Sequence, residues 1–436
     1  MKFINPDYRM KVFFDTVGCR LNQAEIEHMA AQFRAAGHQV IETAENADLV
    51  VVNTCAVTAA ATSDSRQKAR QAHQAGAQRI VLTGCWATLE PDKARDLPGV
   101  SDVISNLEKM NLPLKVVESE FLDFDTEPIA RQPLPGVHSH TRAFIKAQDG
   151  CDNFCTFCVT RVARGKGQSI PKEEILEDIL RAERGGVREI VLSGVHLGSW
   201  GRDGDNDETI TDLLSYLLNH SHIERIRLSS IEPWDLDERF FELWKDPRLC
   251  PHLHLPLQSG SAGVLKRMAR HTSPAAFTDL ISMVRSNIPG VSITTDIIVG
   301  FPGESEAEFD ESLTFVNQMQ FSGGHVFRYS MRDGTAAAKF PNQVDGKTSK
   351  MRAKIINAAI KASEEKYLSS FIGREVDVLW EASGVQSDKG WTLHGLADYY
   401  MKVEALADSN RWNKLDKVRI ETIKNDSLIG KISKFD

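Results

Sequence analysis

The sequence predicts an α/β protein in three parts: an N-terminal open parallel α/β domain, a central barrel or incomplete barrel of six βα units, and a small C-terminal β-barrel. Three observations carry this prediction. Strand-like and helix-like segments alternate up to about residue 110, the alternation resumes at Arg142 for six units, and short alternating strands follow residue 370. A chain of 436 residues is also too long for one ordinary domain.

The N-terminal part contains strands separated by helices. Strands are expected in KVFFDTVGC, DLVVVNTC and RIVLTGC, with an amphipathic helix from Asn22 to Ala36 and an Ala-rich helix that starts near Thr58. This order indicates a parallel sheet with helices on its faces. Residues 111–141 interrupt the pattern with four prolines and an acidic stretch, so we interpret them as an interdomain linker.

The central part repeats a strand followed by a helix. One helix begins at Pro171 with Glu173 and Glu174 in its first turn, where acidic residues suit the helix dipole. Another begins with a capping box formed by Ser305 and Glu308. Six such units in succession predict a barrel or an incomplete barrel. The six expected strands are AFIKAQ, REIVLSG, RIRLSS, HLHLPL, SITTDIIVG and GHVFRYS.

The C-terminal part follows a long helix, expected from about Ser349 to Ser370. Its short strands, REVDVLW, GWTLHGLA, KVRIETI and SLIGKI, predict a small β-barrel. Residues 367–436 contain 10 Lys and Arg against 11 Asp and Glu, so this barrel is not basic overall. We place the domain limits at residues 1–125, 137–366 and 367–436.

The composition is that of a soluble globular protein, with 42% hydrophobic and 26% charged residues. No apolar run is long enough for a transmembrane helix, and the N-terminus lacks a signal-peptide pattern, so we expect a cytoplasmic protein with reduced thiols and no membrane partner. Seven cysteines then indicate metal binding or catalysis rather than disulfides. The net charge of −8 argues against a large uniform nucleic-acid surface but leaves room for a local basic patch.

Three cysteines of the N-terminal part, which we call the first triad, occupy equivalent places. Cys19, Cys55 and Cys85 each lie at or just beyond the carboxyl end of a predicted strand, although 36 and 30 residues separate them. Ligand sites of open parallel sheets form along that edge, so the three thiolates can converge on a shared metal site. The alternative is three buried cysteines that act as small hydrophobic residues.

A second triad, Cys151, Cys155 and Cys158, lies in the stretch GCDNFCTFC directly after the first strand of the central part. A zinc site usually pairs two C-x-x-C elements or adds histidines, and neither is present nearby. A redox pair of the thioredoxin kind would give Cys151 no role. Three thiolates suit an iron–sulfur cluster with one open iron, although such triplets accept several metals. The fourth ligand would then be a cofactor or substrate.

The stretch CDNFCTFC resembles the C-x-x-x-C-x-aromatic-C signature of radical S-adenosylmethionine (SAM) enzymes, with Phe157 as the aromatic residue. The C-terminal barrel resembles the TRAM RNA-binding domain of the methylthiotransferase branch of that superfamily. Segments that resemble this branch occur in order along nearly the whole chain: GCRLNQAEIE, NTCAVT, GCWA, IKAQDGCDNFCTFC, LSGVHLGSWG, LSSIEPWDL, HLHLPLQSGS and DIIVGFPGE.

The resemblance implies a radical SAM barrel with two 4Fe-4S clusters and SAM as cofactors. The second triad would hold the cluster that cleaves SAM to a 5′-deoxyadenosyl radical, and its three cysteines would be catalytic. The first triad would hold a cluster that presents sulfur at its open iron. The partners implied are the anticodon stem-loop of a tRNA and an electron donor such as a flavodoxin, whereas no sulfur donor is identified.

Three substrate groups occur in this branch. GCRLN, NTCAVT and SGVHLGSWG resemble the group that adds a methylthio group to C2 of N6-threonylcarbamoyladenosine (t6A), next to the anticodon. The alternatives are isopentenyl-adenosine in tRNA and an aspartate of ribosomal protein S12. A hypothesis from another class is a metal-stabilised RNA-binding module without catalysis, but open irons argue against it because structural metal sites are usually closed.

Further candidates for contact with SAM lie near strand ends of the central part. Ordinary loop structure is the alternative at each position, and Ser193-Gly194-Val195 departs from the Gly-Gly-Glu usual in the superfamily. The segment FRYSMRDGTAA also departs from the family, with Arg328, Met331 and Asp333 where prolines are usual. The cofactor-binding candidates are Phe157, Ser193, Gly194, Glu232, Gln258 and Ser259.

Basic residues follow both triads and could grip RNA phosphates near the active site, although a charge run usually means only a solvated face. We interpret His252, His254 and Cys250 as structural residues. The basic residues in question are Arg66, Lys68, Arg70, Arg161, Arg164 and Lys166.

Overall fold

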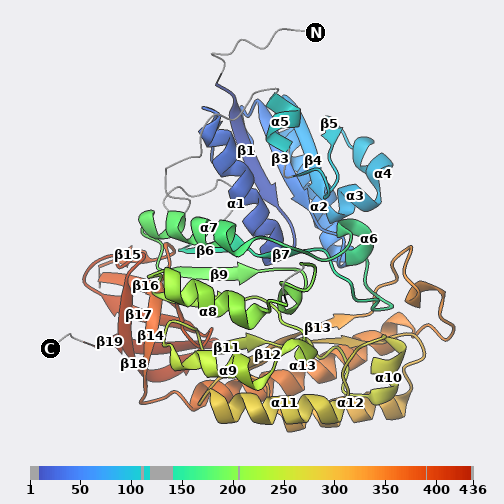
Figure 1. The fold of residues 1–436 in the computed structure, drawn as a ribbon, viewed down its shortest axis with the longest axis vertical. Helices are drawn as coiled ribbons and strands as arrows, with labels where there is room; N and C mark the ends of the chain where they lie inside the picture. The colour runs from blue at the N-terminus through green and yellow to red at the C-terminus, as the bar shows by residue number, and fades with distance from the viewer. Residues whose placement is uncertain (1–8, 110–111, 118–140, 205–206, 389, 434–436) are drawn as a thin grey trace.

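The computed structural model describes residues 9–109, 112–117, 141–204, 207–388 and 390–433 (Figure 1). The predicted linker, residues 111–141, lies almost entirely outside the described residues. The N-terminal sheet lies above the central barrel in Figure 1, and the C-terminal strands form a separate barrel at its lower left. No helix in the described ranges is long and apolar enough to cross a membrane.

The N-terminal sheet is parallel, in the order β2-β1-β3-β4-β5. All of β3 is buried, and apolar clusters cover both faces of the sheet, with Phe14 and Phe33 on one side and Val50 and Leu82 on the other. The predicted open α/β domain is therefore confirmed as a fold. Its elements are β1 (Lys11–Thr16), α1 (Arg20–Ala35), β2 (Gln39–Val40), β3 (Leu49–Thr54), α2 (Ala59–Gln74), β4 (Arg79–Gly84), α3 (Cys85–Leu89), α4 (Pro91–Arg95), β5 (Val100–Val103) and α5 (Leu112–Val117).

The central part contains six parallel strands in the spatial order of the chain, β6-β9-β10-β11-β12-β13. Parallel bridges such as Ser230 to His254 join its two three-stranded sheets. Within the described residues β6 and β13 do not pair, so the barrel is incomplete, as predicted. The strands are β6 (Arg142–Lys146), β9 (Glu189–Ser193), β10 (Arg225–Leu228), β11 (His252–His254), β12 (Ser292–Val299) and β13 (Gly323–Arg328).

Helices cover the outside of this incomplete barrel (Figure 1). The capping box at Ser305 and Glu308 is present and opens α12. Pro171 is the residue that caps α7, one position earlier than a first helical residue. The principal helices are α6 (Thr160–Arg164), α7 (Lys172–Arg184), α8 (Ile210–His220), α9 (Glu238–Glu242), α10 (Ala262–Arg267), α11 (Pro274–Asn287) and α12 (Glu306–Met319), and a short hairpin is formed by β7 (Gln148–Asp149) and β8 (Gln168–Ser169).

The long helix α13 (Gly346–Ser369) leads to a closed five-stranded barrel, in which β14 pairs with both β18 and β16. The sequence did not reveal β17, whose segment KVEALA carries Glu and Ala, residues with little strand preference. Its buried residues Val403 and Ala405 hold it in place between two neighbours. The strands are β14 (Glu375–Trp380), β15 (Val385–Ser387), β16 (Gly390–Ala397), β17 (Lys402–Ala407), β18 (Leu415–Lys424) and β19 (Ser427–Ile432).

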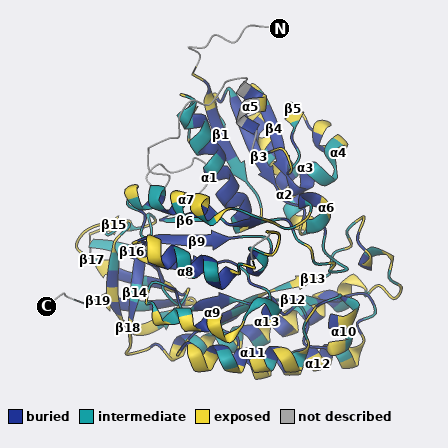
Figure 2. Cartoon of the chain, in the orientation of Figure 1, coloured by how far each residue is buried: buried dark blue, intermediate teal, exposed yellow. Residues whose placement is uncertain are grey.

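The N-terminal sheet lies against the edge strand of the central barrel. Helix α1 packs on β6, where the amide of Phe144 donates to the Glu27 carboxylate over 3.4 Å. Helix α1 is therefore largely buried, as its dark blue colour in Figure 2 shows, whereas α11 and α12 on the outside of the barrel carry exposed yellow faces. The carboxyl ends of β1, β3 and β4 therefore lie close to the first loop of the barrel.

Candidate functional site

The structure places the thiols of the first triad together at the carboxyl ends of β1, β3 and β4. Burial, with smaller contributions from charges on Cys19 and Cys85, raises the pKa of Cys55 to about 12. Cys55 and Cys85 are buried, whereas Cys19 is exposed. The convergence expected from strand ends is present, because each βα unit returns the chain to the same edge of the sheet.

Three of the six triad cysteines directly follow a glycine in the left-handed region: Gly18 (φ 113°), Gly84 (φ 93°) and Gly150 (φ 65°). A Cβ at Gly18 would lie 2.7 Å from the Cys55 sulfur, and one at Gly150 would lie 1.8 Å from the carbonyl oxygen of Lys166. Other residues are thus excluded by both backbone conformation and space. The Gly-Cys pair that the sequence repeats three times is therefore a signal for these cysteine sites, and the sequence analysis did not use it.

The second triad lies in the loop between β7 and α6. The Cys158 sulfur is 3.1 Å from the hydroxyl of Thr160, and the Cys158 amide donates to the Cys155 carbonyl. Burial raises the pKa of Cys155 to about 11 and also raises that of Cys158, to which a charge on Cys151 adds. Thiols held protonated in this way release protons when they bind metal.

The donor sets fit iron–sulfur clusters better than single ions. Across the part of the chain that the structure describes, no three Cys, His, Asp or Glu side chains are close enough to share one metal ion. A mononuclear zinc site would draw its thiolates to within about 2.3 Å of one centre. A cluster instead gives each thiolate its own iron, so its ligands surround a wider space. Each triad offers three free thiols, the number that such a cluster with one open iron takes.

A buried arginine–glutamate pair lies beside Cys155. Arg270 donates from Nη1 and Nη2 to the two Glu232 oxygens over 2.9 and 2.5 Å, and its Nη1 is 3.8 Å from the Cys155 sulfur. Its guanidinium also lies 4.6 Å from the ring centre of Trp234. The predicted candidate Glu232 therefore holds a cation against the triad, and its contact with SAM stays a prediction.

A histidine–aspartate pair lies beside Cys151. His196 Nε2 is 2.6 Å from the Asp235 carboxylate, and Nδ1 is 3.9 Å from the Cys151 sulfur. Burial opposes the charged form, but the hydrogen bond with Asp235 raises the pKa of His196 to about 9. The sequence reading missed both His196 and Arg270, because their carboxylate partners lie 39 and 38 residues away along the chain.

Two predicted cofactor contacts lie beside the second-triad loop: Ser193 ends strand β9, and Gly194 directly follows it. The Ser193 hydroxyl is buried and donates to the carbonyl of Val191 over 3.2 Å. A Cβ at Gly194 would lie 3.1 Å from Cβ of Gln148, so the backbone here approaches the segment before the triad closely. The Ser193 hydroxyl oxygen can still accept a hydrogen bond from SAM, whereas donating one to SAM would require the bond to Val191 to break.

The remaining candidates lie further along the barrel. Gln258 adopts a left-handed conformation (φ 73°), and the Ser259 hydroxyl lies 3.0 Å from that of Ser312 on α12. Phe157 packs edge-on against Phe301, with ring centres 6.5 Å apart. Phe157 thus anchors the second-triad loop to the barrel, while the roles of Gln258 and Ser259 toward SAM stay predictions.

A buried ionic network joins the N-terminal domain to β6 and to helix α6, which follows the second-triad loop. The Glu25 carboxylate lies 2.5 Å from Lys109, 2.8 Å from Arg164 and 3.4 Å from Lys146. Burial opposes ionisation of Glu25, yet the three cations hold its pKa well below the usual range. The amide of Asn106 donates both to the Cys85 sulfur over 3.5 Å and to the carbonyl of Ala163 over 2.9 Å.

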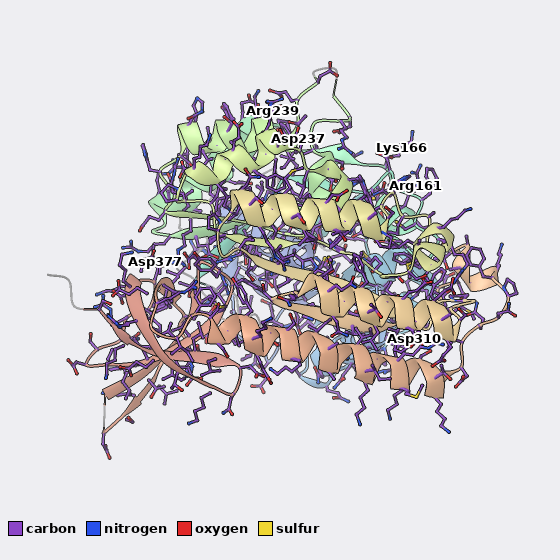
Figure 3. All side chains as sticks on the ribbon, turned by 90° about the horizontal axis from the view of Figure 1, so that it is seen from below. Arg161, Lys166, Asp237, Arg239, Asp310 and Asp377 are labelled. Carbon is purple, nitrogen blue, oxygen red and sulfur yellow. The ribbon has the colours of Figure 1, made fainter. Side chains whose placement is uncertain are left out.

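The prediction that Arg164 grips phosphate is wrong. Its guanidinium is buried and donates to Glu25, Asn22 and Asp149, because a cation inside the protein requires such partners. Arg161 and Lys166 lie together at one end of the central barrel in Figure 3, far from Asp377 of the C-terminal barrel. Their contact with RNA stays a prediction.

Tyr400 lies where the three parts of the molecule meet. Its ring stacks on His252 with centres 4.4 Å apart, and the guanidinium groups of Arg20 and Arg227 lie 5.0 and 5.2 Å from the ring centre. Its hydroxyl accepts a hydrogen bond from Arg20, the residue after Cys19. The left-handed backbone of Tyr400 (φ 65°) is unusual for a bulky residue and is held by these contacts. His252 is therefore an interface histidine, in line with the structural role assigned to it.

Comparison with known proteins agrees with this geometry. Residues 145–316 match the model of the radical SAM superfamily, and residues 11–106 match that of the uncharacterized protein family UPF0004. The chain is 36% identical to the threonylcarbamoyladenosine tRNA methylthiotransferase MtaB of Thermotoga maritima, with 96% of each chain covered. The chain belongs to the radical SAM methylthiotransferase family. Enzymes of this family use 4Fe-4S clusters and SAM, and the two triads are the thiol sets that suit such clusters.

Two further relatives and one solved structure complete the comparison. The chain is 34% identical to MtaB of Bacillus subtilis, with 94% of this chain and 93% of the relative covered. It is 31% identical to the tRNA-2-methylthio-N(6)-dimethylallyladenosine synthase of Staphylococcus haemolyticus, with 96% and 84% covered. The radical SAM methyltransferase TsrM of Kitasatospora setae shares the fold, with a TM-score of 0.56 at 12% identity over 76% of this chain and 77% of that one.

Proposed function

We propose that this protein adds a methylthio group to C2 of t6A next to the anticodon of tRNA. The observation that supports this most is that Asn106 and the Glu25 network tie the surroundings of Cys85 to helix α6, which directly follows the second-triad loop. Methylthio transfer requires both a radical source and a sulfur source close to one substrate atom. The relatives from Thermotoga maritima and Bacillus subtilis, which carry the t6A name, match nearly the whole chain.

Each triad has a distinct task in this proposal. When bound, the cluster on the second triad supplies the electron that cleaves SAM, and the cluster on the first triad supplies the sulfur. The chain itself holds Arg270 beside Cys155 and His196 beside Cys151. Both are cations fixed by a carboxylate, and positive charge near thiolates favours their deprotonated, metal-binding form. Arg270 and His196 therefore act as positioning residues.

The remaining assignments follow from the same proposal. The domain limits are residues 1–125, 137–366 and 367–436, and the last of these is a TRAM-like domain that contacts the anticodon stem-loop. A flavodoxin-like electron donor completes the reaction in the cytoplasm. An anticodon loop suits this chemistry because its bases are partly unstacked already and can turn into a pocket.

Mass spectrometry of nucleosides from digested tRNA tests the function directly. Cells that lack the gene are expected to lose 2-methylthio-t6A and to accumulate t6A, and the intact gene is expected to restore the product. A Cys155→Ala gene is the matched control, since it removes one thiolate and is expected to restore nothing. Unchanged methylthio-t6A in the deletion strain would contradict the proposal.

The alternative substrates are separated in the same experiment. Loss of the 2-methylthio form of isopentenyl-adenosine would transfer the assignment to the substrate that the Staphylococcus haemolyticus relative is named for. An unchanged tRNA profile, together with a lower mass of ribosomal protein S12, would assign the aspartate of S12 instead.

A further inference from the structure

Arg20 carries a charge that no carboxylate of the described residues balances. It is the first residue of helix α1 and directly follows Cys19 of the first triad. Its Nη2 atom donates to the neutral hydroxyl of Tyr400, the one polar partner of its side chain in the ranges that the structure describes. A guanidinium has five N–H donors, so Arg20 can still bind an anion. Buried arginines of the central part, in contrast, each pair with a carboxylate at 2.5 to 2.8 Å: Arg164, Arg227 and Arg270.

Tyr400 holds the charged end of Arg20 in place without neutralising it. The guanidinium carbon lies 5.0 Å from the centre of the Tyr400 ring, within the range of a cation–π contact. The ring in turn stacks on His252, with centres 4.4 Å apart. A half-buried guanidinium held at both the hydroxyl and the ring has lost much of its freedom before a ligand arrives. Binding an anion there costs less conformational entropy for this reason.

These contacts lie on the inner side of the incomplete barrel. Leu253 of β11 packs in the apolar core beneath the outer helices, so its neighbours His252 and His254 face the opposite side. The two imidazoles share the Thr294 hydroxyl, at 3.0 and 2.9 Å. Polar side chains therefore extend from the stacked tyrosine along the inner side of β11 and β12.

The inner side of the barrel is open to a ligand. Val326 of β13 packs against the same apolar core, so His325 faces inward, where it is exposed. His325 lies in register with Asp296, whose carboxylate is 3.4 Å from Nε2 of His254. Cys19 of the first triad is exposed as well. A ligand that enters here meets the polar side chains of β11 to β13.

The two candidate tRNA substrates differ in the chemistry that Arg20 can recognise. The N6 substituent of t6A ends in a carboxylate, whereas the isopentenyl group has neither charge nor polar atom. In adenine, C2 and the carbon that bears N6 flank the same ring nitrogen. A residue that recognises the N6 substituent must therefore lie close to the group that delivers sulfur to C2. Arg20 meets this condition, because Cys19 directly precedes it.

We propose that Arg20 binds the carboxylate of the N6-threonylcarbamoyl group and so selects t6A over adenosines with a neutral N6 substituent. The N–H groups that Tyr400 leaves free donate a pair of charge-assisted hydrogen bonds to the carboxylate oxygens. The inference deepens the proposed function and rests on it. Arg20 is a specificity-determining residue, and it makes and breaks no covalent bond.

Binding of two anticodon stem-loops to the full-length protein with reconstituted clusters tests this role. One stem-loop carries t6A, and the other carries the carboxamide of t6A, which lacks the negative charge. Fluorescence anisotropy is expected to show that the parent binds the acid about tenfold to hundredfold more tightly than the amide, as a hydrogen bond to a charged group predicts. Arg20→Gln is expected to bind both equally, and Arg20→Lys to keep part of the preference, because it keeps the charge but not the fork.

Arg79→Gln is the matched control. Arg79 pairs with Asp102 at the amino end of β4, the end of the sheet opposite to the first triad, so this variant is expected to keep the full preference. The ratio of the two affinities within one variant does not depend on the fraction of protein that is folded. A variant that is merely less stable therefore cannot imitate a loss of preference.

The outcomes separate this inference from the function itself. An equal loss of affinity for acid and amide in Arg20→Gln would overturn the inference, and would assign Arg20 to an RNA phosphate or to the junction with Tyr400 alone. A parent protein that binds acid and amide equally would overturn it as well. Neither result affects the proposed function, which depends on the loss of 2-methylthio-t6A in the deletion strain.

Discussion

The two cysteine triads are built in opposite ways. The first collects Cys19, Cys55 and Cys85 from three strand ends, so its geometry exists only when the whole parallel sheet has formed. The second lies within eight consecutive positions and is shaped by one loop. A site whose ligands come from three strands is as stable as the domain that contains those strands. A site whose ligands come from one loop is only as stable as the contacts that hold that loop.

The charged residues around the two triads are also arranged differently. The second triad has a separate carboxylate-held cation at each of two thiols, Arg270 at Cys155 and His196 at Cys151. The first triad shares one buried network, centred on Glu25, with the domain seam itself. A disturbance of the seam should therefore reach the first triad before the second.

Removing one thiol from each triad gives the largest contrast. Cys85→Ala and Cys155→Ala are each expected to abolish methylthio formation and to leave about four irons of the eight that two clusters would hold. Only Cys155→Ala should also abolish cleavage of SAM to 5′-deoxyadenosine, because the proposed function assigns SAM cleavage to the cluster of that triad. Iron analysis and chromatography of the nucleoside check both points. Loss of SAM cleavage in Cys85→Ala would show that the triads are not separable.

Breaking the shared network is expected to have the next largest effect. Arg164→Met leaves Glu25 with fewer counter-charges in a buried place, which typically costs about 3–5 kcal/mol of unfolding free energy. Urea denaturation followed by circular dichroism measures this loss. Adding Glu25→Gln to the variant should recover part of it, since the stranded charge is then removed. A double variant that is no more stable than the single one would contradict the network.

The glycines before the cysteines give a smaller effect with a matched control. Gly76 and Gly84 both have a left-handed backbone, but a Cβ at Gly76 meets nothing within 4 Å, whereas one at Gly84 would lie 2.3 Å from the carbonyl oxygen of Thr54. Gly76→Ala is expected to cost about 1–2 kcal/mol from backbone strain alone. Gly84→Ala should cost about 1–3 kcal/mol more, from overpacking beside Cys85. Thermal unfolding compares the pair, and equal costs would show that the close approach is unimportant.

The smallest expected effect is a difference in how two glutamates of helix α1 change the free energy of unfolding with pH. Burial raises the pKa of Glu27 to about 7, whereas the neighbouring cations hold the pKa of Glu25 low. Folded Glu27 keeps its proton up to about pH 7, while the unfolded chain loses it near pH 4.3, so stability falls as pH rises between these values. Glu27→Gln should therefore be nearly neutral at pH 5 and stabilising by about 1–3 kcal/mol at pH 8.

Glu25→Gln is the matched control for that prediction. Its folded pKa lies below the unfolded value, so the ionised carboxylate stabilises the protein at pH 8, and the change should destabilise it there. Denaturation at pH 5 and pH 8 compares both variants. A destabilised Glu27→Gln at pH 8 would show that the Glu27 side chain is needed in its charged form.

The sequence predicted those features that repeat along the chain. The βα period fixed the parallel sheet, the incomplete barrel and the convergence of Cys19, Cys55 and Cys85, because each unit returns to the same sheet edge. Strand β17 was not predicted, because its segment contains polar residues and only two buried ones, Val403 and Ala405. The sequence pattern therefore predicts a strand best where large apolar residues at buried positions alternate with polar residues at exposed ones.

The charged partners could not be predicted in this way. Arg270 needs Glu232, and Arg164 needs Glu25 from another domain, 139 residues away. Such pairs depend on which loops meet in space, and a single sequence carries no periodic signal for that. Arg164 was misread for this reason, since a basic residue in a charged run is usually solvated.

The contact of Tyr400 with three parts of the chain also sets an order in time. During synthesis Arg20 and His252 are made long before Tyr400, so the nascent chain first exposes the edge beside Cys19. The contacts of Tyr400 with Arg20 and Arg227 can therefore form only after the C-terminal barrel has been made, so the junction of the three parts is completed last.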